Sequence, residues 1–480
     1  MPIGTAKRVT VFGPVALAGW AACAPLKRSP AAPARPGLDS LVPALLDSAG
    51  VPGLALAIVS GGEIVWAQGF GIRLRGAPGL VDTSTVFEAA SLGKPVFAYA
   101  LMKLVDEGRL DLDRPLASYQ AQPELVHDSR YRRITARMIL CHTSGLPNEV
   151  RAGDKLQLEF EPGTRFGYSG EGFTYLQRVV ETLVQMPLDS FMRRVVFDPL
   201  HMTRSSYRWQ SRFSANFAVG HDDYGTPRPP TRPAAAKAAA SLHTTVADYA
   251  RFLLAMLDNR GQSPAVRRML ARQVDVTSEI SWGLGWSLQQ TDSGKVFWHW
   301  GDNSNSGYTA YVQGDPARRT GFVFLTNSTA GLSLSRALIL RLTGMQEPAV
   351  AFIHQEQFDA PARRVRMSLV NRIRSAGIVA GLAYLDSVRP LFAPEGLPED
   401  LLNRVGYRLL ELGKGHAAVM IFRKNVEAFP QSANVYDSLG EAYAVIGDTA
   451  SAIANYRRSL ALDPRNANAA RMLVRLGAKP

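Results

Sequence analysis

Cysteine is scarce in this 480-residue chain, which contains only Cys23 and Cys141. Two cysteines cannot build a disulfide framework, and no C-x-x-C pair offers a metal site. The eight histidines are scattered, without the H-x-H or H-E-x-x-H spacing that zinc sites use. The sequence therefore predicts neither a metal ion nor another cofactor.

Concentrated positive charge is also missing. The formal net charge is +13, but the arginines are spread along the chain and no segment interleaves basic with aromatic residues. Nucleic-acid-binding proteins usually gather their charge in one patch, so we expect no nucleic-acid partner. With 46% hydrophobic and 20% charged residues, the composition is that of a globular protein. A chain of this length exceeds one ordinary core and predicts two or more domains.

The apolar stretch at the N-terminus is too short to span a membrane as a stable helix. It runs from Val9 to Ala22 and follows Lys7 and Arg8. A positive region followed by a short apolar region is typical of an export signal. We therefore expect residues 1–24 to be a signal and the protein to be periplasmic or attached to the cell envelope.

Two interpretations of the end of this signal stay open. Small residues before Cys23 resemble a bacterial lipoprotein signal, which would make Cys23 a lipid anchor. Alternatively, Ala22-Cys23-Ala24 is a small-x-small cleavage site. Trp20 departs from the first pattern, and Pro25 is unfavourable for the second.

Strand signals occur at both ends of a long central segment. Residues 25–37 are rich in Pro, Ala and Arg and predict a linker. Two apolar runs then flank Gly61-Gly62, as in a hairpin. Residues 85–275 have a mostly helical pattern with long loops. The apolar runs are Leu54–Val59, Ile64–Ala67, Gly283–Leu288, Val296–Trp300, Tyr308–Gln313 and Gly321–Thr326. We predict an α/β (α+β) domain over residues 38–345, with a five-stranded antiparallel sheet and a helical insertion.

The C-terminal part has a 34-residue period. Residues 346–396 are expected to be a connector, with a helix near 364–375. Over 397–477, matching residues recur 34 positions apart: Gly406 and Gly440, Gly413 and Gly447, Ala418 and Ala452, Phe422 and Tyr456, and Pro430 and Pro464. This pattern resembles the tetratricopeptide repeat (TPR), whose helix pairs bury their apolar faces on one another. The repeats predict a groove for a protein or peptide partner. The alternative is a generic helical bundle.

The only S-x-x-K sequence of the chain is Ser91-Leu92-Gly93-Lys94. Apolar spacing predicts a helix from Pro95 to Glu107, which places Ser91 at its first turn. Residues three apart share a helix face, so Lys94 would point at the Ser91 hydroxyl. A buried lysine can lose its charge and accept the serine proton. The alternative is a helix-capping serine beside a solvated lysine.

The segment from Phe87 to Lys94 resembles the nucleophile segment of the serine β-lactamase and penicillin-binding protein superfamily. It is most similar to the class C β-lactamase-like branch, which includes esterases and D-aminopeptidases. Further similar motifs follow in family order: Leu140–Pro147, Tyr168-Ser169-Gly170 at the Tyr-x-Asn motif, Trp282–Trp286, and His299-Trp300-Gly301 at the Lys-Thr-Gly or His-x-Gly motif. The resemblance covers about residues 38–345 and implies the β-lactamase/transpeptidase-like fold.

The resemblance also implies roles for individual residues. Ser91 is the nucleophile and Lys94 helps to take its proton. Tyr168 is the phenol or phenolate that carries a proton to the leaving group, with a pKa that Lys94 could lower. His299 donates a hydrogen bond to the substrate or to Tyr168. The backbone N–H groups of Ser91 and Asp302 form the oxyanion hole.

Two positions depart from the family pattern within the expected substrate-binding set, Gly170, Gly301 and Asp302. Gly170 replaces an asparagine whose amide would hold the substrate carbonyl and orient Lys94. His299 replaces the lysine that β-lactamases use against a substrate carboxylate. His142 is expected to support the backbone of its loop and not to take part in catalysis.

Three functions compete at this point. The first is a serine hydrolase acting on small ester or amide substrates. The second is a D-Ala carboxypeptidase or weak β-lactamase acting on peptidoglycan-like substrates. The third is an inactive hydrolase fold that binds a partner through its helical repeats.

Overall fold

The computed structural model describes residues 37–150, 153–258, 263–291, 294–344, 348–353, 355–393 and 396–479. The predicted signal, Cys23 and the predicted linker up to residue 36 lie outside the described residues. Among the helices within those ranges, none is long and apolar enough to cross a membrane.

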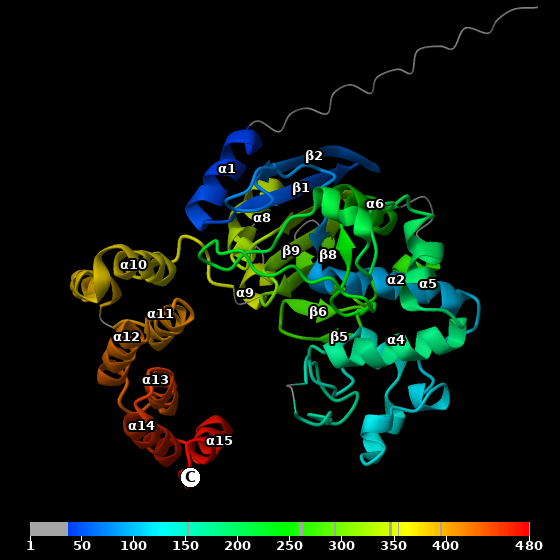
Figure 1. Cartoon of the computed structure of the whole chain (residues 1–480). Coiled ribbons are helices and arrows are strands. Elements are labelled where there is room, and N and C mark those ends of the chain that lie inside the picture. The colour runs from blue at the N-terminus through cyan, green and yellow to red at the C-terminus, as the bar shows by residue number, and fades with distance from the viewer. Residues whose placement is uncertain are drawn as a thin grey trace, which may run out of the picture. The chain divides into compact units, whose positions relative to one another are not determined.

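The centre of the structure is one antiparallel sheet of eight strands (Figure 1). Its spatial order is β2-β1-β10-β9-β8-β7-β6-β5. The strands are β1 Gly53–Ser60, β2 Glu63–Gly71, β5 Val274–Asp275, β6 Ile280–Trp282, β7 Ser287–Thr291, β8 Gly294–Asn303, β9 Tyr308–Asp315 and β10 Thr320–Thr326. The mixed α/β fold class is confirmed, but the prediction of five strands was wrong.

The additional strands lie at the β5 edge and are short. Most of the expected strand Gly283–Leu288 is instead a turn, in which the Gly283 N–H donates to the carbonyl of Trp286, and only its last two residues lie in β7. As a result, β6 ends before the turn and β7 begins after it. Strands β5 and β6 have only two and three residues, which is too short for an alternating pattern to be recognised.

Both faces of the sheet are covered by helices because the strands alternate their apolar side chains. In β1, Leu54, Leu56 and Ile58 join the core beneath α1 (Leu38–Ala49) and α8 (Ser335–Thr343). The residues between them belong to the opposite core, which includes α2 (Gly93–Asp106) and α6 (Val246–Leu257). The insertion also contains a short two-stranded sheet and four more helices: β3 Phe87–Glu88, β4 His243–Thr244, α3 Ala136–Leu140, α4 Gly170–Val184, α5 Leu188–Met192 and α7 Pro264–Met269.

The C-terminal part is helical in every described segment. Helix α10 (Pro361–Val388) contains the predicted helix near 364–375 and has a kink at Gly377. The remaining helices are α9 Pro348–Phe352, α11 Glu399–Glu411, α12 Gly415–Ala428, α13 Ala433–Val445, α14 Thr449–Leu462 and α15 Ala467–Arg475.

Two helix pairs in this part pack through the same contact. A Cβ atom on Gly406 would lie 2.4 Å from the Phe422 ring, and one on Gly440 would lie 3.2 Å from the Tyr456 ring. A side chain at either glycine would therefore push the paired helices apart. The two contacts are 34 residues apart, as the repeat pattern requires. The identification of the pairs as TPR units stays a prediction.

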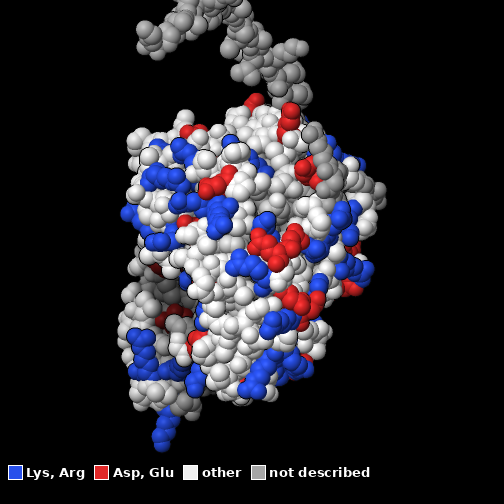
Figure 2. All heavy atoms as spheres, turned by 90° about the vertical axis from the view of Figure 1, so that its right-hand side faces the viewer, with Lys and Arg blue, Asp and Glu red and all other residues white. Residues whose placement is uncertain are grey.

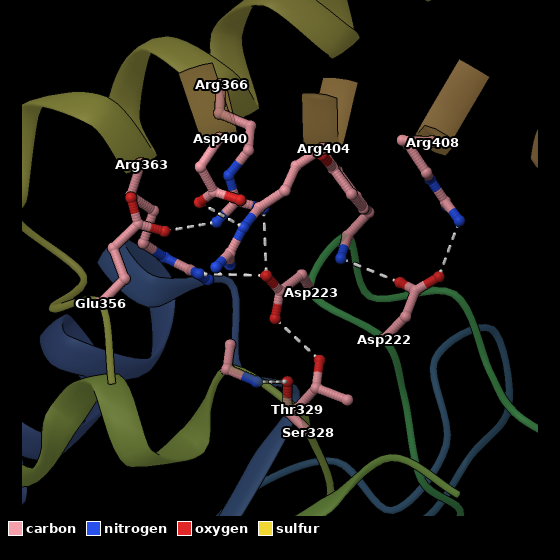
Figure 3. A network of polar contacts seen from close by, with 12 residues as sticks. Asp222, Asp223, Ser328, Thr329, Glu356, Arg363, Arg366, Asp400, Arg404 and Arg408 are labelled. Atoms are coloured by element: carbon pink, nitrogen blue, oxygen red, sulfur yellow. Dashed lines mark hydrogen bonds and ion pairs between the residues drawn. The ribbon is translucent and has the colours of Figure 1, made fainter. Parts of the chain in front are cut away.

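A buried ion-pair cluster joins the loop at Asp222 and Asp223 to the C-terminal helices α10 and α11 (Figure 3). Asp222 contacts Arg408 of α11 at 2.9 Å, and both side chains are only 6% exposed. Asp223 contacts Arg363 and Arg366 of α10 at 3.3 and 3.1 Å. Buried pairs of this kind are costly to break, because removal of one partner leaves an uncompensated charge. The cluster therefore holds α10 and α11 against the loop that carries the two aspartates.

Basic residues do not form one continuous patch on the face shown in Figure 2. Lys and Arg appear there as separate groups, and Asp and Glu lie between them. The excess positive charge is thus distributed over this face.

Replacement of Arg408 with methionine should destabilise the protein. Asp222 would remain buried, with Arg228 as its remaining cation at 3.8 Å, so we expect a loss of about 3–5 kcal/mol of unfolding free energy. Urea unfolding followed by circular dichroism measures this loss. Arg404→Met is the matched control, because the Arg404–Asp400 pair is 50% and 66% exposed and should contribute less than about 1 kcal/mol. Equal losses in both variants would contradict a stabilising role for the buried ion-pair cluster.

Candidate active site

Ser91 lies on a strained turn between a strand and a helix. It is the middle residue of a short 3-10 helix, η1 (Ala90–Leu92), which leads directly into α2. Ala90 has φ = 50°, a left-handed conformation that non-glycine residues seldom adopt and that costs about 1–3 kcal/mol. The turn leaves the Ser91 side chain partly exposed, whereas the residues on both sides are buried. Such strain is typical of functional sites.

Strand β8 lies directly beside this turn. Its first residues, Gly294–Trp298, pair with β7, and β9 pairs with β8 from Phe297 onward, so that residues 299–303 pair only with β9 among the described strands. Helix η1 approaches β8 there so closely that a Cβ atom on Gly301 would lie 2.4 Å from the carbonyl oxygen of Ala89. Glycine at 301 thus allows this edge of β8, including the Asp302 backbone, to run past Ser91.

Lys94 points at Ser91, as their spacing on a helical turn predicts. Its Nζ lies 2.9 Å from Ser91 Oγ and donates a second hydrogen bond of 2.7 Å to the carbonyl of Ala239. The side chain is only 2% exposed, so it is not the solvated lysine of the alternative interpretation. Burial lowers the pKa of Lys94 to about 7, and the negative charge of Glu149 acts in the opposite direction.

Tyr168 lies over the Lys94 amine in an aromatic environment. The amine is 5.0 Å from the centre of the Tyr168 ring, and the His142 ring stacks on Tyr168 with 4.2 Å between the ring centres. Burial raises the Tyr168 pKa well above its ordinary value, although the nearby Ser91 hydroxyl acts to lower it. The expectation that Lys94 lowers this pKa was therefore wrong, because desolvation outweighs any nearby charge. Tyr168 is a neutral phenol at neutral pH, and its Oη forms no hydrogen bond of good geometry with the described residues.

His142 supports the loop that carries Tyr168. Its Nδ1 accepts a hydrogen bond of 3.0 Å from the backbone N–H of Ser169. Ser169 in turn caps α4, because its Oγ accepts from the N–H of Gly172 at 2.9 Å. Burial lowers the His142 pKa well below its usual value, so the ring is neutral. These contacts agree with the structural role expected for His142.

His299 is also neutral, and its unpartnered ring nitrogen presents a lone pair where we expected a donor. Its Nδ1 lies 2.7 Å from the carbonyl oxygen of Trp300. A carbonyl can only accept, so Nδ1 carries the proton and Nε2 presents a lone pair. Burial lowers the pKa of His299 to about 3. Nε2 has no partner among the described residues. The predicted donor role of His299 toward the substrate or Tyr168 is therefore corrected.

Gly170 is explained by close packing. A Cβ atom at this position would lie 2.5 Å from the carbonyl oxygen of Asn148, and the Gly170 N–H already donates to that oxygen at 3.2 Å. An asparagine could not be placed here unless the Asn148 loop moved. The structure therefore gives Gly170 a packing role, and its predicted contact with substrate stays a prediction.

Three contributors to the site were missed in the sequence. Glu88 accepts hydrogen bonds from Asn303 and Ser306, and so ties the end of β8 to the Ser91 segment. Ala239 contributes only its carbonyl, for which no side-chain signal exists, and Glu149 follows a loop motif as an ordinary surface carboxylate. Within the described ranges, no group of three or more His, Cys, Asp or Glu side chains could hold a metal ion.

A model of the Beta-lactamase family matches residues 38–343, which is well over half of the chain. The chain belongs to the beta-lactamase family. It is 28% identical to Penicillin-binding protein 4 of Amycolatopsis lactamdurans over 339 residues, which are 62% of this chain and 88% of that protein. It is 23% identical to Protein flp of Staphylococcus aureus (strain MRSA252) over 206 residues, 39% of this chain and 41% of Flp.

Solved structures of the same fold show how much of the chain the family likeness covers. The Beta-Lactamase/D-Alanine Carboxypeptidase from Pseudomonas syringae matches with a TM-score of 0.56 and 18% identity. The match covers 98% of that chain and 65% of this one. This likeness establishes the fold of the beta-lactamase family domain. The C-terminal helices lie outside the residues matched by the family model.

Gly301→Ala should lower the reactivity of Ser91 without unfolding the protein. The added methyl group would meet Ala89 and move β8 away from Ser91, and a misplacement of about 1 Å can cost about 100-fold in rate. The rate of Ser91 labelling by a fluorophosphonate measures the effect. Lys295→Ala, at the exposed far end of β8, serves as the control. An unchanged labelling rate in Gly301→Ala would show that the approach of β8 is unimportant.

Proposed function

We propose that this protein is a serine hydrolase that forms an acyl-enzyme at Ser91 and acts on small ester or amide substrates. The observation that carries the proposal is the 2.9 Å contact between Ser91 Oγ and a buried amine whose pKa is about 7. A serine hydroxyl is a weak nucleophile until a neighbouring base takes its proton. A general base is most effective when its pKa lies near the working pH.

The first half of the reaction transfers the acyl group to the enzyme. Ser91 Oγ attacks the substrate carbonyl carbon, and its proton passes to the neutral amine of Lys94. The backbone N–H groups of Ser91 and Asp302 would stabilise the negative oxygen that forms. The bond to the leaving group then breaks. The leaving group takes a proton from the Lys94 ammonium, directly or through the Tyr168 hydroxyl, which receives one proton as it gives up another.

The second half releases the product. A water molecule attacks the acyl carbonyl while Lys94 accepts one of its protons. The bond to Ser91 Oγ breaks, and this oxygen regains a proton from Lys94. Tyr168 remains a phenol at the start and end of the cycle, which agrees with its raised pKa. A phenol that can donate and accept in one step is suited to relay a proton.

The charges at the site favour esters or amides over β-lactams. His299 stands where β-lactamases place a lysine, and at neutral pH it is an uncharged acceptor. It therefore offers no positive charge to a substrate carboxylate. The alternative, a D-Ala carboxypeptidase or weak β-lactamase, draws support from the names of the relatives above. The non-enzymatic alternative is a scaffold whose repeats bind a protein or peptide.

We further infer that the protein is exported to the periplasm or cell envelope. Lys7, Arg8 and the apolar stretch after them support export, and Cys23 would be the lipid anchor if the signal is of the lipoprotein type. Intact-mass measurement of the protein from its native membrane fraction distinguishes a lipidated Cys23 from a chain cleaved after Ala24.

Covalent labelling should distinguish the three functions. A fluorophosphonate probe should add to the wild-type protein, and Ser91→Ala should remove both this adduct and ester turnover because the attacking oxygen is lost. Intact-mass spectrometry measures the adduct, and the melting temperature of Ser91→Ala should change little. A stable penicillin adduct would favour the carboxypeptidase alternative. No adduct with either reagent would favour the scaffold.

The activity should rise with pH through about 7. Lys94 must be neutral to accept the Ser91 proton, and its pKa of about 7 places this change near neutrality. The pH profile of kcat/KM for an ester measures this midpoint. Glu149→Gln should move the midpoint to lower pH, because Glu149 raises the Lys94 pKa. Glu159→Gln is the control of equal charge change. A profile flat between pH 5 and 9 would contradict Lys94 as the base.

A further inference from the structure

A run of alanines contributes to the site near Ser91 through its backbone. Residues 234–240 read Ala-Ala-Ala-Lys-Ala-Ala-Ala, and the run ends in a turn that Ser241 closes. The Ser241 N–H donates to the carbonyl of Lys237 at 3.0 Å, and the Lys237 N–H donates to Ser241 Oγ at 2.8 Å. An alanine side chain has no donor or acceptor, so its residue can bind a polar neighbour only through a peptide group.

Two carbonyls of this turn bind residues of the candidate site. The Ala239 carbonyl accepts a hydrogen bond from Lys94 Nζ at 2.7 Å, and the Ala240 carbonyl accepts one from Asn303 Nδ2 at 3.2 Å. Asn303 is the last residue of β8. The turn therefore contacts both the amine beside Ser91 and the end of the strand that runs past it.

One side chain of α4 binds the same turn with both ends of its amide. Gln177 Nε2 donates to the carbonyl of Ala236 at 2.9 Å, and Gln177 Oε1 accepts from the N–H of Ala238 at 2.8 Å. Two hydrogen bonds from one planar amide fix the orientation of the turn as well as its distance from the helix. Tyr168 lies two residues before the start of α4. Gln177 thus connects the turn that binds Lys94 to the helix that follows Tyr168.

The Ala239 carbonyl determines how the Lys94 amine faces Ser91. A neutral amine has two N–H bonds and one lone pair, and it can rotate among its staggered positions about the Cε–Nζ bond. When one N–H is held by the carbonyl, the lone pair can point at the Ser91 hydroxyl, 2.9 Å away. Once the amine has taken the serine proton, the same carbonyl stabilises the ammonium through a charge-assisted hydrogen bond.

We propose that Gln177 is a positioning residue for the base of the reaction, because it holds the Ala239 carbonyl against the Lys94 amine. The proposal rests on the proposed function, since the amine needs this orientation only if it activates Ser91. Among the described residues, the hydrogen bonds of the Gln177 side chain go to the turn and, at 3.4 Å, to Glu181. Gln177 therefore acts through the turn and not on the reacting atoms.

Replacing Gln177 with another uncharged residue alters no charge around the amine. The titratable side chains that act on Lys94 or lie against it come from other elements: Glu149, His142, Tyr168 and His299. The turn itself carries Lys237, whose side chain is exposed. A change in the ionisation of Lys94 in such a variant would therefore come from its hydrogen bond to Ala239.

Gln177→Met tests the proposal, because methionine has a similar length but cannot form the two hydrogen bonds. The turn stays attached through Ser241 Oγ, which donates to the carbonyl of Tyr207 at 2.7 Å, so we expect the variant to fold. With 4-nitrophenyl acetate as substrate, kcat/KM at high pH should fall about tenfold because the amine is less well oriented. The midpoint of its pH profile should move down by about one unit, because the ammonium loses stabilisation.

Two further variants accompany this test. Gln177→Asn keeps the amide but is one methylene shorter, so it should behave like Gln177→Met. Gln185→Met is the matched control. Gln185 is exposed at the C-terminal end of the same helix, and its amide donates to the carbonyl of Thr182 within that helix. This control should leave both the rate at high pH and the midpoint unchanged.

The outcomes separate the positioning role from the chemistry at Ser91. A wild-type profile in the folded Gln177 variants would overturn the role of Gln177 and leave the proposed function standing. A lower rate with an unmoved midpoint would also overturn it, because the loss would not come from Lys94. A wild-type protein that neither turns over the ester nor is labelled by a fluorophosphonate would overturn the proposed function itself. Circular dichroism checks folding, and Gln177→Asn decides the result if Gln177→Met does not fold.

Discussion

The chemistry proposed for this protein depends on one buried amine to which no carboxylate of the described residues is bonded. Lys94 is 2% exposed, and its hydrogen bonds go to the Ser91 hydroxyl and the Ala239 carbonyl. Desolvation therefore disfavours the ammonium and brings its pKa to about 7. An aspartate or glutamate bonded to this amine would restore the charge and remove the base. The aromatic rings around the amine keep water out, so the fold maintains the low pKa through packing alone.

The elements around Lys94 place Ser91 beside the backbone of strand β8. The left-handed Ala90 turns the serine outward, the absence of a side chain at Gly301 lets β8 pass beside it, and Glu88 fixes the end of that strand. The Tyr168 loop is set by His142 and the capping Ser169. None of these five supporting residues has a role in the proposed reaction. They fix where Ser91 and Tyr168 lie, and a misplacement of about 1 Å can cost about 100-fold in rate.

Much of this arrangement could be predicted from the sequence, and the remainder has a physical explanation. The Ser91–Lys94 contact follows from helical spacing, and the long strands follow from their alternating apolar residues. The protonation states could not be predicted, because they depend on burial by residues far away in the chain. For this reason the pKa of Tyr168 is raised where we expected it to be lowered, and His299 presents a lone pair where we expected a donor. Strands β5 and β6 were missed because two or three residues are too few to show an alternation of apolar and polar side chains. The contribution of Ala239 is a backbone carbonyl, which any residue would supply.

The molecule uses buried charge in two opposite ways. The Lys94 ammonium has no bonded carboxylate, so its burial is relieved by loss of the proton, and the neutral amine becomes available for chemistry. Arg366 of α10 and Arg408 of α11 are buried to a similar degree, at 3% and 6% exposed, but each meets a carboxylate at 2.6–3.1 Å. Pairing raises the Arg366 pKa despite burial, so that charge persists and holds two parts of the chain together. A lysine suits the first role because it can deprotonate, and an arginine suits the second because it does not. The same cost of burial thus leaves a neutral amine beside Ser91 and charged arginines between two parts of the chain, and the difference depends on whether a carboxylate is within bonding distance.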